Sequence, residues 1–578
     1  MTSEFRAPAW RVWVLAAAFL TCACVVLSRL YAFQVLDHDR LRGMADDEQA
    51  QDLVIPPKRG ALLDAGRRPL AISVMYDNLY VYGPLVKDPA RTAATLAPVI
   101  EMPERDILAK IDREKRAPVL VKGRLAAEDS IRVTALKLPG LYLQPAPYRA
   151  YPEGSIAAQV LGFVGLDAEG LAGLELSYND ELAGVPGRLV SARDTTGQEI
   201  TVARQEYVPA VDGADLVLTI DRYLQRVAER ELQAAVQSNK AVGGQILIMD
   251  PTTGGIMAAA AWPTYSLTEP IRPEQAALWK PTMATDVYEP GSVMKVVTMS
   301  AAVDEGLVTP DTTVSDPGSV LVDGVRISNW DFNGHGTITM RQVLIYSSNV
   351  GSSFVARRLG PDRFYKYLDL FGFGQPTGIR LPGEAAGSYR TPEDETWRPI
   401  DLTTNSYGQG VAVTPLQMIT AYAALANDGV LMRPMLVKEL RRGDDVEPVP
   451  PEVVRRVVSS HTAQQLTDMM VSVLQQPAQQ QNRIPGYVIA GKTGTADTPT
   501  AGGYQLNRTY ASQIGFAPVD HPRFVMLVRL DAPEALYGGA AASPLFKRMA
   551  EELFTYLRIP PSEPQPTPRP TTRAAGTR

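Results

Sequence analysis

The first pattern along the chain is an uncharged, mostly apolar run, residues 12–27 (VWVLAAAFLTCACVVL). Arg29 interrupts the pattern, and a second apolar stretch covers residues 30–36. The first run is slightly shorter than the ~20 residues that a membrane-spanning helix needs. The side chain of Arg29 can reach the membrane interface, which allows the span to extend. The pattern therefore predicts an uncleaved membrane anchor over residues 12–36, preceded by a short segment, residues 1–11.

Two other kinds of N-terminal segment compete with an anchor. A cleaved signal peptide fits the arginines that precede the run, but there is no clean A-x-A site and more apolar residues follow Arg29. A lipoprotein signal would use Cys24, yet residues 21–23 fit the usual lipobox poorly, and apolar residues 25–27 follow where a polar tether is expected. The numbers of lysines and arginines before and after the apolar segment are nearly equal. The positive-inside rule therefore does not show which end of the anchor lies in the cytoplasm.

Residues 37–210 contain short apolar pieces separated by glycine and proline. The sequence IPPKRG at 55–60 leads into such pieces at 61–66 and 69–73. Strand-like pieces broken by Gly and Pro predict a hairpin region. No candidate catalytic cluster gathers here, so we expect a structural or docking module.

Residues 211–559 predict a second unit that mixes strands and helices. Alternating apolar residues over 214–221 predict a strand, and residues 245–250 predict another. Between them, apolar residues at three- and four-residue spacing predict a helix: Leu224, Val227, Ala228, Leu232 and Ala235. Residues 560–578 are rich in Pro and Thr and have no apolar periodicity, which predicts a disordered tail.

Composition and charge exclude several classes of protein. Hydrophobic residues make up 45% and charged residues 21%, which is typical of chains with packed cores. A net charge of -6 argues against nucleic acid as the main partner. The two cysteines, Cys22 and Cys24, both lie in the N-terminal apolar run, so the rest of the chain offers neither disulfides nor a cysteine zinc site. The four histidines show no pair at ligand spacing, and we expect no metal centre.

A candidate nucleophile lies at Ser292, within YEPGSVMK. Pro290 and Gly291 do not favour a helix, whereas the residues from Val293 onward can form one, which places Ser292 at a helix N-terminus. Lys295 then lies on the same face, one turn further on. A serine needs a base to remove its proton, and a lysine serves as that base when its pKa is depressed. Alone, S-x-x-K is a weak signal, because a surface Ser/Lys pair gives the same pattern.

A second candidate motif is S-x-N, formed by Ser347 and Asn349 in YSSNVG. The serine hydroxyl can relay a proton to a leaving amine, and the asparagine side chain can hold a peptide backbone. A helix N-cap gives the same pattern, so this motif is weaker still.

A third candidate motif is KTGT at 492–495, which follows the strand-like YVIAG at 487–491. Lys492 offers a second cation near Lys295, and the hydroxyls of two threonines can bind a carboxylate. Glycines permit close approach of a peptide that adds to a sheet edge. A basic edge strand that discourages aggregation gives the same pattern.

The ordered set of three motifs is far more specific than any one of them. S-x-x-K, S-x-N and K-T-G in this order resemble the penicilloyl-serine transferase superfamily. YEPGSVMK, SSNVG and AGKTGTA are each similar to the class B penicillin-binding proteins, especially the division-type transpeptidases. Three further segments are similar to that family: residues 413–429, IPPKRG and YPEGSIAAQVLGFVG. The resemblance therefore covers roughly residues 10–558.

The resemblance implies an α+β fold with three parts. These are a single N-terminal transmembrane helix, an elongated α+β pedestal, and a β-lactamase/DD-peptidase-like domain with a central antiparallel sheet and helices. It implies that Ser292 is the acylated nucleophile and Lys295 its general base. The other implied roles are proton relay and substrate positioning for Ser347 and Asn349, and binding of the substrate carboxylate for Lys492, Thr493 and Thr495. Gly494, which completes the motif, permits close approach of the backbone. The backbone N–H groups of Ser292 and Thr495 would form the oxyanion hole, and no metal or organic cofactor is implied.

The implied activity is cross-linking of peptidoglycan stem peptides outside the cytoplasmic membrane. Ser292 would attack the D-Ala-D-Ala bond of a donor stem, and an amine of a neighbouring stem would resolve the acyl-enzyme. SSNVG and VTPLQM favour a division-type protein, with an elongation-type protein as the alternative. The implied partners are stem peptides, β-lactam antibiotics, a multi-span glycan polymerase of the shape, elongation, division and sporulation family, and other divisome membrane proteins.

Three related classes of protein fit the sequence less well. A class A β-lactamase shares the three motifs but needs an E-x-x-L-N element, and none is found between Asn349 and Lys492. A bifunctional penicillin-binding protein needs a glycosyltransferase domain, for which Glu128 and Asp129 lack the flanking residues. A β-lactam sensor is expected to carry several membrane spans, and an idle scaffold has no reason to keep every motif residue.

Overall fold

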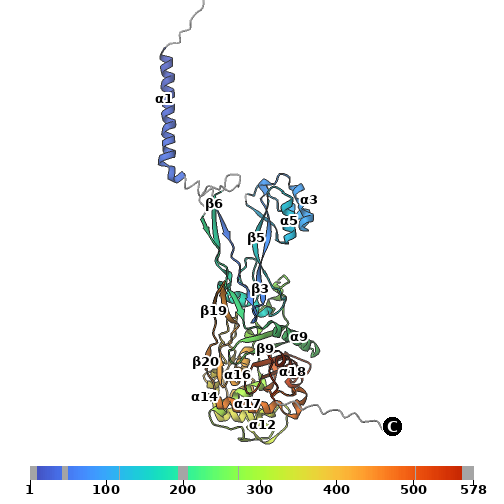
Figure 1. Cartoon of the computed structure of the whole chain (residues 1–578). Helices are drawn as coiled ribbons and strands as arrows, with labels where there is room; N and C mark the ends of the chain where they lie inside the picture. Colours follow the sequence, from blue (N-terminus) through green and yellow to red (C-terminus); the bar gives the residue numbers. More distant parts are fainter. Residues whose placement is uncertain are drawn as a thin grey trace, which may run out of the picture. The chain divides into compact units, whose positions relative to one another are not determined.

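The computed structural model describes residues 9–41, 50–115, 117–192, 206–270, 272–500 and 503–562. The predicted disordered tail falls almost entirely outside these ranges, as do residues 1–8. By its internal contacts the chain divides into two compact units, residues 1–58 with 184–212, and residues 59–183 with 213–578. Figure 1 shows the elements of both units.

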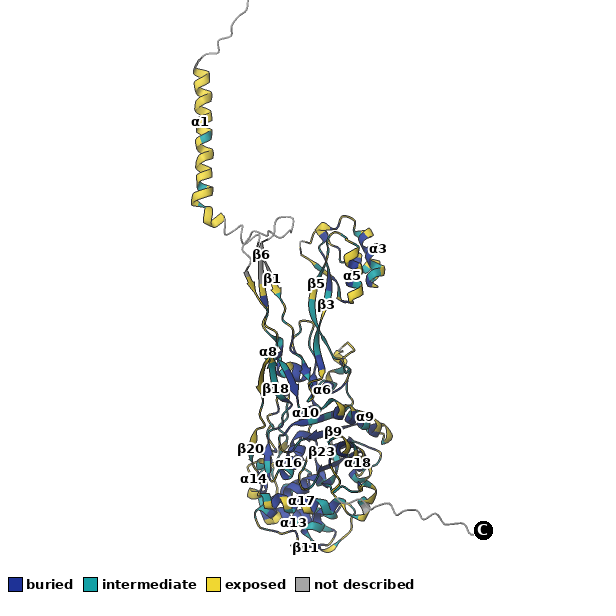
Figure 2. Ribbon diagram, viewed as in Figure 1, coloured by how far each residue is buried: buried dark blue, intermediate teal, exposed yellow. Residues whose placement is uncertain are grey.

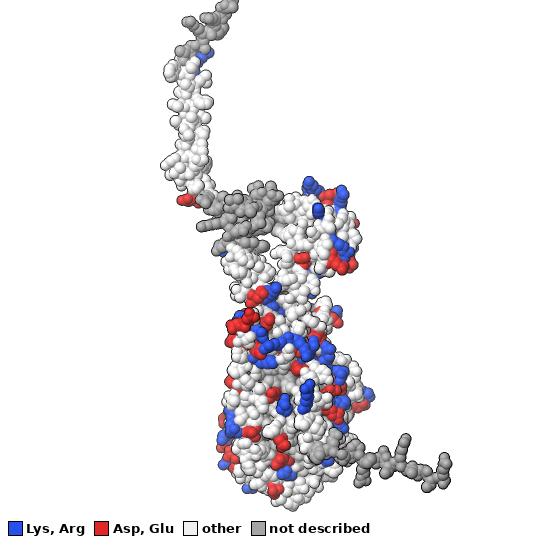
Figure 3. All heavy atoms as spheres, in the orientation of Figure 1, with Lys and Arg blue, Asp and Glu red and all other residues white. Residues whose placement is uncertain are grey.

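The smaller unit contains a long apolar helix. Helix α1 spans Ala9–Tyr31 and continues as a π-helical turn, η1, over Ala32–Leu36. Residues 10–36 are long and apolar enough to cross a membrane, about 40 Å at the rise of an α-helix. Nearly all its side chains are exposed (Figure 2), and the face shown in Figure 3 is uncharged between its ends. The predicted anchor, residues 12–36, lies within this helix.

The smaller unit also holds an antiparallel sheet in the order β1-β6-β7, formed by β1 (Ala50–Ile55), β6 (Gly187–Ala192) and β7 (Glu206–Val208).

In the larger unit, a seven-stranded sheet joins the first part of the chain to the second. Strand β2 pairs antiparallel with β3, as the predicted hairpin requires, and parallel with β8, which pairs in turn with β18. The sheet consists of β2 (Leu62–Leu63), β3 (Pro69–Val81), β4 (Val119–Leu125), β5 (Leu141–Ala150), β8 (Asp215–Leu218), β18 (Val437–Arg442) and β19 (Asp445–Pro448). A separate small core lies at the far end of β3, where it packs with α3 (Pro89–Ile100), α4 (Glu104–Leu108) and α5 (Ala127–Ala135).

A five-stranded antiparallel sheet in the order β10-β9-β23-β22-β21 forms the centre of the larger unit. Its strands are β9 (Gly243–Met249), β10 (Ile256–Trp262), β21 (Ala490–Thr500), β22 (Gly503–Ala517) and β23 (Phe524–Asp531). Strand β9 is buried on both faces, and its side chains alternate between two cores, as the two-residue period of a strand requires. Ile246 and Ile248 pack with α9 (Arg222–Ser238) and α18 (Gly538–Tyr556). Leu247 and Met249 pack with the core that contains α11 (Met294–Asp304) and α16 (Pro415–Ala426).

Helix α11 is buried along almost its whole length, from Met294 to Val303. A helix that is apolar on every side is typical of the centre of a large core. Its neighbours α13 (Asn349–Leu359) and α17 (Ser460–Leu474) contact it directly, and α17 also contacts β21. The helix is thereby fixed, and so is the turn that precedes it.

The remaining elements connect these layers. They are η2 (Gly83–Leu85), α6 (Ala158–Leu161), α7 (Gly173–Ser177), α8 (Asn179–Ala183), η3 (Pro273–Leu278), α10 (Thr282–Thr285), η4 (Gly291–Val293), β11 (Thr313–Asp316), β12 (Ser319–Val322), β13 (Val325–Ser328), β14 (Gly336–Thr339), α12 (Met340–Ile345), α14 (Pro361–Leu370), β15 (Ser388–Tyr389), α15 (Pro399–Asn405), β16 (Val411–Ala412), β17 (Val430–Met432), β20 (Val453–Arg456) and η5 (Pro477–Asn482).

The predicted α+β class, with an apolar N-terminal helix, a first α+β part and a central antiparallel sheet, is confirmed.

One predicted strand is displaced. Residues 487–491 were expected to form it, but β21 begins only at Ala490 because Gly486, at φ +82°, turns the chain just before. Tyr487 instead stacks on Phe554 of α18, with ring centroids 3.8 Å apart.

Candidate active site

Ser292 lies in the 3-10 turn η4, which leads directly into α11. The turn depends on Gly291, whose φ is +60°, a conformation that favours glycine. A Cβ atom at Gly291 would lie 2.4 Å from the carbonyl oxygen of Thr495, so a side chain there would push the turn away from β21. The glycine before the serine therefore brings the first motif against the strand that carries the third.

Lys295 follows on the first turn of α11 and is only 1% exposed. Its Nζ lies 3.1 Å from Ser292 Oγ, 2.5 Å from the Ser347 carbonyl oxygen and 2.8 Å from Asn349 Oδ1. A neutral amine has two N–H donors and one lone pair. The carbonyl and the amide oxygen accept those two donors, which leaves the lone pair for a hydroxyl: that of Ser292 at 3.1 Å or that of Ser347, whose Oγ lies 3.2 Å away.

The electrostatic surroundings of Lys295 favour this neutral form. Burial lowers the pKa of Lys295 well below its ordinary value, and the nearby charge of Lys492 lowers it further. The carboxylate of Asp316 acts in the opposite direction but is the smallest of the three causes. This position and this lowered pKa suit a general base for Ser292, which is the role that the S-x-x-K spacing predicts.

Ser347 bridges the nucleophile and the second lysine. Its Oγ lies 2.9 Å from Ser292 Oγ and 3.1 Å from Lys492 Nζ. The residue has a φ of +54°, which is uncommon for a side-chain-bearing residue and costs backbone strain. The turn between α12 and α13 holds it there, so its hydroxyl lies where a proton can pass between Ser292 and Lys492.

The third motif lies on β21, an edge strand of the five-stranded sheet. Lys492 is 2% exposed, and its Nζ also donates to the Thr493 carbonyl oxygen at 2.9 Å. Burial lowers the pKa of Lys492 to about 7, so near neutral pH this lysine is only partly charged, which the motif alone does not predict. A Cβ atom at Gly494 would lie 2.5 Å from Ser512 Oγ and 3.0 Å from the Pro290 carbonyl, so glycine is required for this close packing.

A cavity of about 1170 Å³ opens over the three motifs. Its lining includes residues of all three motifs: Ser292, Ser347, Asn349, Lys492, Thr493 and Thr495. Gly494 is buried and does not line the cavity. Aromatic residues form part of its wall, among them Trp330, Tyr407 and Tyr537. The structure thus brings every predicted site residue to one place, although their separate roles stay predictions. The hydroxyl of Thr495 also accepts a hydrogen bond from the backbone N–H of Gly538 at 3.0 Å, which ties β21 to the start of α18.

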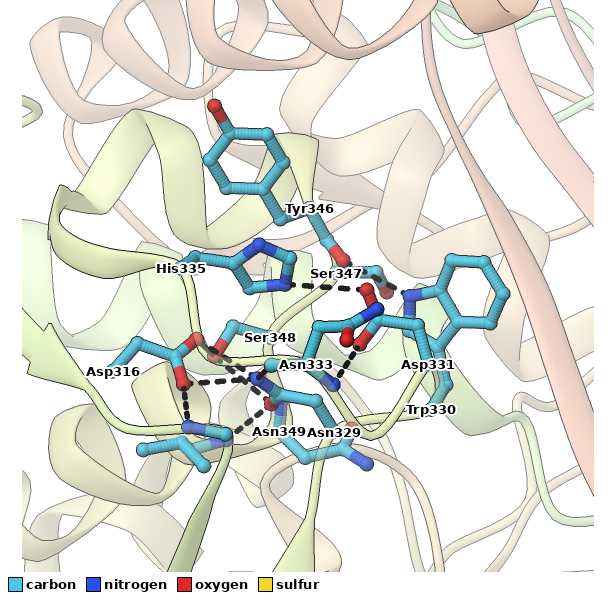
Figure 4. Close-up of polar contacts among 12 residues, drawn as sticks. Asp316, Asn329, Trp330, Asp331, Asn333, His335, Tyr346, Ser347, Ser348 and Asn349 are labelled. Atoms are coloured by element: carbon cyan, nitrogen blue, oxygen red, sulfur yellow. Dashed lines mark hydrogen bonds and ion pairs between the residues drawn. The ribbon is translucent and has the colours of Figure 1, made fainter.

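A buried polar network behind the second motif is not evident in the sequence (Figure 4). The Asp316 carboxylate accepts hydrogen bonds from Ser348 Oγ at 2.6 Å and from Asn329 Nδ2 at 2.9 Å. Asn329 Oδ1 in turn accepts from the backbone N–H groups of Asn349 and Val350, at 2.9 and 3.2 Å. Asp316, Asn329 and Ser348 are all almost completely buried. The network fixes the start of α13, and with it the side chains of Ser347 and Asn349 that contact Lys295.

We expect Asp316→Ala to lower the free energy of unfolding by about 3 kcal/mol, because three buried donors would lose their acceptor. Acylation of Ser292 should also slow, since Asn349 would no longer be held against Lys295. Chemical denaturation and acylation rates measure the two effects. Asp311→Ala, at an exposed aspartate, is the control and should change stability by no more than about 0.5 kcal/mol. Equal stability of the two variants would contradict the role given to the network.

Two family models match the chain. The penicillin binding protein transpeptidase domain matches residues 244–551, and the penicillin-binding protein dimerisation domain matches residues 54–218. The chain is 32% identical over 557 residues to stage V sporulation protein D of Bacillus subtilis, covering 94% of this chain and 85% of that protein. It is 30% identical over 564 residues to peptidoglycan D,D-transpeptidase FtsI of Escherichia coli, covering 96% and 92%.

Solved structures agree with these relatives. A peptidoglycan synthetase from Bifidobacterium adolescentis superimposes with a TM-score of 0.73 at 27% identity, over 90% of this chain and 98% of that one. Penicillin binding protein 3 from Mycobacterium tuberculosis, in complex with aztreonam, gives a TM-score of 0.68 at 30% identity, over 89% and 100%. In both sequence and structure, then, the chain belongs to the class B penicillin-binding proteins.

Proposed function

We propose that the protein is a peptidoglycan D,D-transpeptidase that works through an acyl-enzyme on Ser292. The observation that carries this proposal is the contact of Ser292 Oγ with the Nζ of the buried Lys295, at 3.1 Å, inside a cavity large enough for a peptide. The name of the Escherichia coli relative, peptidoglycan D,D-transpeptidase FtsI, supports the same chemistry, and similarity to it supports a division-type role in septal wall synthesis. An elongation-type role is the alternative.

The geometry supports a two-step reaction. In the first step Lys295 accepts the proton of Ser292, whose Oγ attacks the carbonyl carbon of the D-Ala-D-Ala bond. Lys295 then gives this proton back through Ser347, whose Oγ lies 3.2 Å from Lys295 Nζ, to the departing amine, so that D-Ala leaves and an ester forms. In the second step the amine of a neighbouring stem peptide attacks the ester, and its proton returns to Ser292. The carboxylate of the leaving D-Ala is expected at Lys492 and Thr493.

Turnover of a stem peptide in the presence of an added amine tests the proposed reaction. We expect release of D-Ala together with an amide product, and a labelled penicillin should occupy the same site as a substrate analogue. Rapid hydrolysis of penicillin would instead indicate a β-lactamase. Stable acylation without any amide product would indicate a sensor. Filamentation on depletion of the protein would favour division over elongation.

We propose that residues 1–11 are cytoplasmic, residues 12–36 span the membrane and everything from residue 37 lies outside the cytoplasm. The proposed parts are a pedestal over residues 37–210, a transpeptidase domain over 211–559 and a tail over 560–578. The extracytoplasmic location of the substrate supports this orientation. Fusions after residue 60 to a reporter that works only outside the cytoplasm should be active. Activity confined to a cytoplasmic reporter would reverse the orientation.

The pedestal and the anchor are expected to dock on a multi-span glycan polymerase of the shape, elongation, division and sporulation family, with other divisome membrane proteins nearby. Replacing residues 10–36 by an unrelated span, or deleting residues 60–200, should abolish co-purification with that polymerase. Deletion also removes β2 and β3, which pair into the sheet with β8, so penicillin labelling must confirm that the rest still folds. Ser292→Ala is the control that should keep the partner. Intact co-purification with both altered chains would rule out this docking mode.

A further inference from the structure

A carboxylate that the three motifs do not include lies on the cavity face of β21. Asp497 stands two residues beyond Thr495 on the same strand, and both line the cavity, as does Thr493. Alternate residues of a strand point to the same face, so these three side chains form a row. The Cα atom of Asp497 lies about 7 Å along the strand from that of Thr495, on the side away from Lys492.

The Asp497 carboxylate is partly buried, and no lysine, arginine or histidine of the described residues forms an ion pair with it. Among the residues that the structure describes, no ion pair or side-chain hydrogen bond involves it. Asp331 has the other carboxylate that lines the cavity, and its Oδ2 lies 3.5 Å from His335 Nε2. Burial raises the pKa of Asp497, because it disfavours the charged form of the carboxyl group. A cation brought by a ligand would stabilise that charged form.

The surroundings of Asp497 suit an ammonium group. Thr509 lies directly opposite it on β22 and donates its hydroxyl hydrogen to the Leu536 carbonyl at 2.7 Å. The next residue, Tyr537, lines the same cavity with Gln479. Carboxylate, amide oxygen and aromatic ring are the groups that bind an ammonium in proteins.

The order of groups along β21 determines which part of a substrate reaches Asp497. In the proposed reaction the leaving D-Ala carboxylate lies at Thr493 and the attacked carbonyl at the backbone N–H of Thr495. The acyl half of the donor must then continue along the strand toward Asp497. The amine that resolves the acyl-enzyme has to reach the ester itself, which is too far from Asp497 for that same amine to be bound there.

We propose that Asp497 is a specificity-determining residue that binds a primary ammonium on the acyl half of the donor stem peptide. This inference rests on the proposed transpeptidation, in which donor and acceptor stems each carry an amine. The groove would then have two charged ends: Lys492 binds the leaving carboxylate at one end, and Asp497 binds the amine of the retained peptide at the other.

Two penicillins that differ only at the end of the acyl chain test the inference. An aminocaproyl penicillin ends in an ammonium, and an adipoyl penicillin of similar length ends in a carboxylate. We expect wild-type protein to react faster with the first. Asp497→Asn should lower that acylation rate constant roughly three- to tenfold and raise the rate with the carboxylate probe. Asp497→Lys should reverse the preference, and salt should weaken it in the wild type.

Glu534→Gln is the matched control, because it removes an exposed carboxylate that pairs with Lys240 outside the cavity. It should leave the ratio of the two rate constants unchanged. If Asp497→Asn and Asp497→Lys also leave that ratio unchanged, the inference is wrong. Failure of both penicillins to acylate the wild type would instead overturn the proposed function, so the two failures are distinguishable.

Discussion

Replacing Ser292 by alanine is expected to abolish covalent labelling by β-lactams and to reduce turnover on the order of 10⁶-fold, as in other activated-serine enzymes. The reason is geometric. Ser292 Oγ is the hydroxyl that contacts both the buried Lys295 and Ser347 while facing the cavity. Without it, the remaining side chains can bind a substrate but cannot form the ester. Mass spectrometry of the penicillin-treated protein gives the readout.

The control for this substitution is Ser238→Ala, at an exposed serine near the end of α9. It should label at the wild-type rate, and the adduct of the wild type should map to the peptide that contains Ser292. Ser347→Ala distinguishes the nucleophile from the proton relay. This variant should still form the penicillin adduct on Ser292, but more slowly than the wild type. A penicillin adduct on Ser347 or on any residue other than Ser292 would contradict the assignment.

The catalytic motifs were predictable because each depends on short-range geometry. Lys295 follows Ser292 by three residues, so any helix that starts at the serine places the lysine one turn away. Gly291 and Gly494 are likewise visible in the sequence, and both are needed for the approach of the first turn to β21. The order of the three motifs predicted the family, because three weak patterns in one order are specific even though each pattern alone is not.

Features that depend on long-range packing were not predictable. Asp316 follows no motif, and only the pairing of β11 with β14 and of β12 with β13 brings it and Asn329 beneath the second motif. Asp497 follows the third motif by two residues, but only the folded structure shows that it lines the cavity and forms no ion pair with the described residues. The start of β21 was misplaced by three residues, because apolar periodicity does not show where Gly486 turns the chain.

Lys295→Arg is expected to lose nearly all acylation, about 10³–10⁴-fold, whereas Lys492→Arg should keep a measurable part of it. Arginine does not deprotonate in proteins, so it cannot accept the proton of Ser292. At position 492 the charge matters more than the proton, because Lys492 faces the expected substrate carboxylate. Acylation rate constants of both variants with one penicillin give the comparison. Comparable residual activity in the two would defeat this division of roles.

The same division of roles predicts a bell-shaped pH dependence of kcat/KM. Lys295 acts when neutral, so activity rises as the pH increases through its lowered pKa. Lys492 acts when charged, so activity falls as the pH increases through its pKa, which burial lowers to about 7. A bound carboxylate favours the charged form, so the descending limb of kcat should lie at higher pH than that of kcat/KM. Lys492→Arg should remove the descending limb, because arginine keeps its charge, and a limb that persists in this variant would assign it to another group.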